Sequence, residues 1–116
     1  MTDIHYIPDG WVLCKYKNNY KVFCSWSGGY LHGDSWRLHS KVRTVHRDDD
    51  ANYIINKDGT SYQLNPHAYG RISVYNRVEL SGFEEKGLEV LEESEGILTL
   101  ELLTDLTREA TVSVID

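Results

Sequence analysis

The side chains that could act as catalytic nucleophiles lack the sequence context that such chemistry requires. Ser27 is followed by Gly28 and Gly29, but the first glycine of a nucleophile elbow and its strand-to-helix turn are missing. Cys24 and His32 could be drawn as a nucleophile and its base, yet a buried cysteine usually serves as a small apolar side chain. The sequence therefore predicts a protein that is not an enzyme and has no catalytic residues.

The metal-binding patterns in the sequence are equally incomplete. The segment Asp48-x-Asp50-x-Asn52 matches the first three ligand positions of a calcium loop, but Tyr53 replaces the required glycine and Gly59 the closing glutamate. The five histidines show no metal-ligand spacing, and only the fold can decide whether they meet in space. We predict no metal site and no cofactor.

Charge divides the chain into two different parts. Residues 1–78 carry ten Lys and Arg against seven Asp and no Glu, a net charge of +3. Residues 79–116 carry two Lys and Arg against nine Glu and two Asp, a net charge of −9. All thirteen aromatic residues lie at or before Phe83. We therefore predict a single domain over residues 1–116, with an aromatic, mildly basic part up to residue 80 and an acidic part from residue 81 onward.

Four glutamates of the acidic part form the predicted binding surface. Ser81-x-x-Glu84 matches a capping box and Gly96 could end a helix, so we predict one helix near residues 82–95. Its polar face would carry Glu85, Glu89, Glu92 and Glu93. Like charges four residues apart, and acids at a helix C-terminus, both cost stability. Two explanations stay open: the charges keep the protein dissolved, or they bind a basic partner.

Aromatic and basic side chains offer an alternative binding set for a small ligand or a single-stranded nucleic acid. The set is Trp26, Trp36, Arg37, Arg71, Tyr75 and Arg77. The net charge of −6 and pI of about 5.3 are far from the basic footprint of a nucleic-acid-binding protein. The arginines could instead neutralise the acidic part within the fold. We therefore favour a protein partner over direct binding of nucleic acid.

A hairpin in the first part of the chain should organise the fold. We predict it over residues 11–26, with a two-residue turn at Asn18 and Asn19. Because side chains alternate along a strand, Cys14 and Cys24 then lie on opposite faces and form no disulfide. Both faces of the hairpin are apolar, which predicts a central position with cover on each side.

The remaining elements follow from apolar periodicity and turn residues. Further strands are expected over residues 4–7, 30–45, 53–55, 61–64, 71–80 and 111–115. In the 71–80 segment, Ile72, Val74, Val78 and Leu80 would share the buried face. Residues 97–106 fit either a strand or a continuing helix. The fold class is thus α+β, mainly β: a twisted antiparallel sheet, open or partly closed, with one helix packed on it.

The sequence also bears on where the protein works. No apolar run approaches the roughly 20 residues that span a membrane, and the N-terminus lacks the basic and apolar regions of a signal peptide. We expect a cytoplasmic protein without membrane association. An oligomer is compatible with the sequence.

Several segments resemble small proteins encoded by tailed phages and prophages. The resemblance covers roughly residues 20–70 and rests on Ser-Trp-Ser-Gly-Gly-Tyr-Leu at 25–31, Gly-Asp-Ser-Trp-Arg-Leu at 33–38, Gly-Thr-Ser-Tyr at 59–62 and Tyr-Gly at 69–70. That family has no assigned activity, so it lends no functional residues to this chain. The acidic segment after Glu79 lies outside the resemblance.

The resemblance implies a function of a general kind. Short phage accessory proteins without catalytic motifs often bind and block a host factor, commonly a defence nuclease or a CRISPR complex. We therefore expect a non-catalytic, anti-CRISPR-like inhibitor or adaptor that binds a host protein or nucleoprotein complex through its acidic surface.

Overall fold

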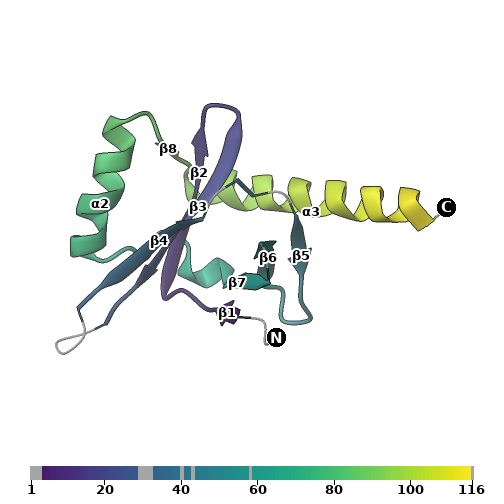
Figure 1. The fold of residues 1–116 in the computed structure, drawn as a ribbon, viewed down its shortest axis with the longest axis horizontal. Coiled ribbons are helices and arrows are strands. Elements are labelled where there is room, and N and C mark those ends of the chain that lie inside the picture. The colour runs from purple at the N-terminus through teal and green to yellow at the C-terminus, as the bar shows by residue number, and fades with distance from the viewer. Residues whose placement is uncertain (1–3, 29–32, 40, 43, 58, 116) are drawn as a thin grey trace.

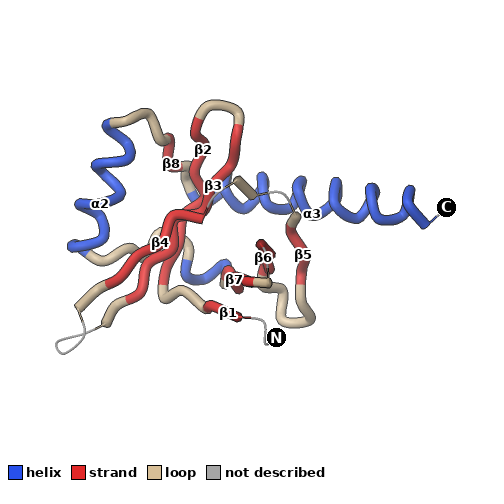
Figure 2. The backbone as a smooth tube through the Cα atoms, viewed as in Figure 1, coloured by secondary structure: helices blue, strands red, loops and turns tan. Residues whose placement is uncertain are grey.

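The computed structural model describes residues 4–28, 33–39, 41–42, 44–57 and 59–115, and folds them into two four-stranded sheets and two α-helices (Figures 1 and 2). The predicted α+β class is confirmed. The single antiparallel sheet expected from the sequence is instead two sheets, and one of them contains a parallel pair.

The hairpin at the centre forms as predicted, with its turn displaced by one residue. Strand β2 (Gly10–Tyr16) pairs antiparallel with β3 (Asn19–Trp26). Tyr16 pairs with Asn19, so the chain turns at Lys17 and Asn18, and Lys17 takes a φ of 55°. The predicted register is therefore wrong by two positions. An even shift leaves every side chain on its predicted face.

The first sheet is built around this hairpin. Strand β4 (Ser35–His39) pairs with β3, and the two-residue β8 (Glu89–Val90) pairs with β2, giving the order β4-β3-β2-β8. Side chains on both faces of the hairpin are buried, which confirms its predicted central position. Cys14 and Cys24 are buried and unbridged, also as predicted.

The second sheet combines three consecutive strands with one from the start of the chain. Strands β5 (Val45–Arg47), β6 (Tyr53–Lys57) and β7 (Thr60–Leu64) pair antiparallel. Strand β1 (Ile4–Tyr6) adds to β7 in parallel, giving the order β1-β7-β6-β5. A short 3-10 helix, η1 (Pro66–Ala68), follows β7.

The first sheet lies between the second sheet and helix α2 (Val74–Glu85), which explains why both of its faces are apolar (Figure 1). On one face, Trp26 packs edge-on against Tyr6 of the second sheet, with ring centroids 5.8 Å apart. On the other face, Phe23 contacts Phe83 of α2, with centroids 6.5 Å apart.

Helix α2 replaces the strand that was predicted over residues 71–80. The hydroxyl of Ser73 caps the helix by accepting a hydrogen bond from the backbone N–H of Asn76 at 3.2 Å. Asn76 and Leu80 are buried four residues apart, which is one helical turn. The strand prediction failed because apolar residues two and four positions apart fit both periods. The helix ends before Gly87, whose φ of 106° suits a C-terminal glycine.

The helix predicted near residues 82–95 does not exist as one unit. Those residues contain the end of α2, strand β8 and the start of helix α3 (Glu93–Ile115). The left-handed backbone at Gly87 breaks the helix and lets the chain return to pair with β2. Residues 97–106 are helical, and so is the 111–115 segment predicted as a strand.

Candidate protein-binding surface

The four glutamates of the predicted binding surface are all exposed, but they do not share a helix face. Glu85 is the last residue of α2, Glu89 lies in β8, Glu92 precedes α3, and Glu93 begins α3. The prediction that they project from one helix is wrong because the helix stops before Gly87. The repulsion expected between residues four apart on that helix therefore does not arise.

Together with their neighbours these residues form a larger acidic surface. By this name we mean the exposed glutamates between residues 84 and 95: Glu84, Glu85, Glu89, Glu92, Glu93 and Glu95. Lys86 is the only cation in the same stretch. In the part of the chain that the structure describes, the one ion pair joins Arg47 to Glu101, so none of the six takes part in one. Their charges face solvent.

Local stability accounts for only part of the acidic surface. Glu93 and Glu95 lie in the first turn of α3, where the helix dipole favours negative charge. Glu89 is on an edge strand, where charge discourages pairing with another chain. Glu84 and Glu85 end α2, where the dipole opposes negative charge. For these two residues the fold offers no local benefit.

The alternative set of aromatic and basic residues is divided between the two faces of the first sheet. Trp36 stacks on Phe23 on the α2 side, with centroids 5.6 Å apart, and remains 38% exposed. Arg37 points the other way and donates from Nη1 to the Tyr62 hydroxyl at 3.1 Å. Trp26 shares the side of Arg37, and its indole donates to a main-chain carbonyl. The structure does not assemble the two tryptophans into one stacking platform.

Tyr75 and Arg77, two further members of the alternative set, lie on α2, which carries an exposed apolar surface that the sequence did not predict. Val74, Tyr75 and Val78 of α2 are 80%, 79% and 69% exposed, and we call them the apolar α2 face. Arg77 is exposed beside them and donates from Nη2 to the carbonyl of Gly70 at 3.1 Å; Arg71 is also exposed. The strand prediction buried both valines, so it concealed this surface. The signal that would have revealed it is the Ser73 cap, which starts a helix.

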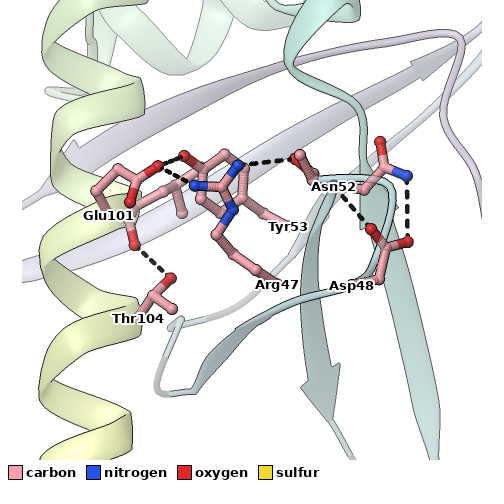
Figure 3. Close-up of polar contacts among 8 residues, drawn as sticks. Arg47, Asp48, Asn52, Tyr53, Glu101 and Thr104 are labelled. Atoms are coloured by element: carbon pink, nitrogen blue, oxygen red, sulfur yellow. Dashed lines mark hydrogen bonds and ion pairs between the residues drawn. The ribbon is translucent and has the colours of Figure 1, made fainter.

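A polar cluster of distant residues fastens α3 to the second sheet (Figure 3). Glu101 of α3 pairs with Arg47 Nη1 at 2.6 Å and accepts a hydrogen bond from the Tyr53 hydroxyl. Burial, and then the bond to Glu101, raises the pKa of Tyr53 to about 12. Nearby, the Asp48 carboxylate accepts a hydrogen bond from the backbone N–H of Asn52 at 2.8 Å. This bond lowers the pKa of Asp48. Arg47 thus neutralises one charge of the acidic part, the role that we considered for the arginines of the alternative set.

In the described part of the chain, the cysteines first considered for catalysis are buried and the candidate metal ligands are not grouped. Burial raises the pKa of both Cys14 and Cys24 to about 12, so neither thiol ionises near neutral pH. His32, drawn as a partner for Cys24, lies outside the described residues. His39 is buried, edge-on to the ring of Tyr62. Among the residues with described positions, no three His, Cys, Asp or Glu side chains are grouped so as to hold a metal ion.

Neither the helices nor a comparison with known proteins assigns a role to this surface. None of the helices in the described part of the chain is both long and apolar enough to cross a membrane. Comparison with protein-family models, curated proteins and solved structures finds no match to this chain. The resemblance to phage proteins, and the function that it implies, therefore stay predictions.

Proposed function

We propose that this protein is a small, non-catalytic inhibitor or adaptor of phage origin that binds a host protein through its acidic surface. The supporting observation is the set of six exposed glutamates between residues 84 and 95, none of which forms an ion pair within the described chain. Two of them, Glu84 and Glu85, lie where the helix dipole opposes them. A surface of one charge attracts a partner of the opposite charge and aligns it.

The partner's contact surface should be basic. Proteins that handle nucleic acid carry such surfaces because they neutralise phosphate groups with lysine and arginine. Exposed carboxylates can take the place of those phosphates. A nucleic-acid-handling complex in the host cytoplasm, such as a CRISPR effector, is therefore the class of partner that fits. The same charge opposes direct binding of nucleic acid to this surface.

Charge reversal tests the proposal. The first variant changes Glu85, Glu89, Glu92 and Glu93 to Lys. We expect it to lose the partner that the parent protein retains from host lysate at low salt. The parent complex should also form more slowly as salt rises, because the Debye length falls to about 10 Å at 0.1 M. The fold should persist, which circular dichroism and thermal unfolding would verify.

A matched control separates the acidic surface from net charge. Asp49, Asp50, Glu79 and Asp105 are exposed and lie outside the acidic surface. Changing these four to Lys alters the net charge by the same amount. The control variant should still retain the partner. Equal binding by the first variant and the parent, or equal loss in both variants, would contradict the proposal.

A further inference from the structure

The outer side of helix α2 carries apolar side chains that no described residue covers. The buried residues of this helix are Asn76 and Leu80, and Asn76 donates from Nδ2 to the Ser25 hydroxyl and the Ser35 carbonyl of the first sheet. Because an α-helix repeats every 3.6 residues, Val74 and Val78 lie on the opposite side, with Tyr75 beside them. Clustered apolar exposure on a surface helix marks an interaction site more often than isolated exposure does. The apolar α2 face therefore calls for an occupant.

Gly82 leaves an open position next to this face. It lies in α2 four residues after Val78, and a Cβ placed on it would meet no atom within 4 Å. Its φ is not positive, so the backbone does not require glycine. Glycine weakens a helix relative to alanine, and nothing within the described chain compensates for that loss. A second backbone approaching from outside would use the space that the missing side chain leaves.

The charges along α2 are arranged so that the helix complements itself. Arg77 and Glu84 are both exposed and stand seven residues apart, which is about two turns, so they lie along the same flank of α2. In an antiparallel pair related by a two-fold axis, each flank faces the same flank of the partner, running in the opposite direction. Arg77 of each copy then comes opposite Glu84 of the other copy, and the contact occurs twice.

From these three features we propose that the protein forms a two-fold dimer in which the α2 helices of two copies pack antiparallel. The apolar α2 face of each copy lies over Ser81 and Gly82 of the other, where the small side chains admit close approach. The two pairs of Arg77 and Glu84 fix the register. Glu89, Glu92 and Glu93 lie outside the contact, so the dimer keeps most of the acidic surface accessible.

Sedimentation equilibrium on full-length variants tests the charge pairing. The parent chain should show a monomer–dimer equilibrium. Arg77→Glu places two acids opposite each other, and Glu84→Arg places two bases opposite each other. Each variant alone should dimerise more than about tenfold more weakly, since facing like charges cost several kcal/mol. An equimolar mixture of the two variants should dimerise again, because each supplies the charge that the other needs.

A second pair of variants tests the apolar contact with a matched control. Val78→Glu puts a charge in the centre of the proposed interface and should give a monomer. Leu98→Glu changes an equally apolar side chain that is 60% exposed on α3, outside the interface, and should leave the dimer intact. Circular dichroism of each variant would verify that α2 still folds.

Three outcomes would overturn the proposal. The parent could stay monomeric at every concentration examined, in which case a different protein covers the apolar α2 face. The single charge variants could dimerise as well as the parent. The mixture could fail to recover the dimer that each variant alone has lost, which would exclude the antiparallel pairing of Arg77 with Glu84.

Discussion

At the scale of single residues, three glycines differ in their surroundings. A Cβ on Gly10 would overlap the backbone carbonyl of Arg71, and one on Gly96 would overlap the ring and hydroxyl of Tyr69. A Cβ on Gly82 would meet nothing. The first two glycines let segments far apart in the sequence pack in contact, whereas the third serves no contact within the described chain.

This contrast gives opposite expectations for two alanine substitutions. Gly10→Ala should lower the free energy of unfolding by about 1–3 kcal/mol, because backbone atoms must move to admit the methyl group. Gly82→Ala should raise it by about 0.5–1 kcal/mol through helix propensity. Urea denaturation of both variants, at a protein concentration low enough to keep the chain monomeric, measures the difference. Similar effects of the two substitutions would contradict this interpretation.

Tyr69 joins three segments through one buried hydroxyl group. The hydroxyl donates to the carbonyl of Leu91 at 2.7 Å and accepts the backbone N–H of Leu13 at 3.2 Å. Tyr69→Phe should destabilise the fold by about 1–3 kcal/mol, because both buried backbone groups lose this partner. Chemical denaturation measures the loss. Tyr75→Phe is the control: Tyr75 is exposed and should tolerate the change within about 0.5 kcal/mol.

At the scale of elements, the Glu101 cluster sets how α3 is attached. The pair of Arg47 and Glu101 is more than a third exposed, so its own contribution should be about 0–1 kcal/mol. The hydroxyl of the buried Tyr53 also depends on Glu101. The carboxylate should therefore matter more than the guanidinium.

Two alanine variants measure this order. Arg47→Ala should destabilise the protein by at most about 1 kcal/mol. Glu101→Ala should cost about 1–3 kcal/mol, since it leaves the hydroxyl of Tyr53 without its acceptor. Thermal unfolding of both variants and of the double variant gives the coupling energy. A larger loss in Arg47→Ala than in Glu101→Ala would show that the ion pair, not the hydroxyl bond, secures α3.

The elements that the sequence predicted well are those whose apolar residues and turns fit strands and not a helix. They include the hairpin over residues 11–26 and the strands expected over residues 53–55 and 61–64, which lie within β6 and β7. The segment from residue 71 to 103 was ambiguous because its apolar residues fit both strand and helix spacing. Ser73 and Gly87 bound α2, and the cap at Ser73 is the signal that would have favoured the helix.

The candidate site was predicted in composition but not in geometry. The exposure of the four glutamates followed from their charge, whereas their distribution over α2, β8 and α3 depends on the break at Gly87. The apolar α2 face was missed for the reason already given. The contact of Arg47 with Glu101 spans 54 residues and leaves no local trace in the sequence.

At the scale of the whole molecule, the charge division does not coincide with a structural one. The change from basic to acidic falls between residues 78 and 79, in the middle of α2. The acidic part supplies an edge strand to the first sheet through β8, and α3 packs against the second sheet through Glu101. The two parts of the chain therefore share one set of packed layers.

Two buried thiols and two buried phenol groups should make the folded state less stable as the pH rises into the alkaline range. The pKa values of Cys14 and Cys24 rise from 9.0 to about 12, and those of Tyr53 and Tyr69 from 10.0 to about 12. The unfolded chain therefore loses these protons at lower pH than the folded chain does. Their contribution is complete below pH 9 and is lost as the pH rises toward 12.

The measurement is the urea midpoint as a function of pH. The midpoint should fall steadily from about pH 9 to pH 12. Tyr69→Phe removes one of the four groups, so its midpoint should fall less steeply above pH 10 than that of the parent. A midpoint that stays constant up to pH 12 would show that these groups ionise equally in the folded and unfolded chain.

Each sheet is completed by a strand from a distant part of the chain, and this has a consequence for synthesis on the ribosome. Each sheet takes three strands from one continuous stretch and its last strand from elsewhere: β8 pairs with Cys14 and Lys15 at the edge of β2, and β1 pairs with the edge of β7. As the chain emerges, β1 has no partner until residues 60–62 follow it, and the edge of β2 stays open until residues 89 and 90 appear. Exposed strand edges recruit other chains. We therefore expect the nascent protein to be most exposed to pairing with other chains during the interval before β8 is made.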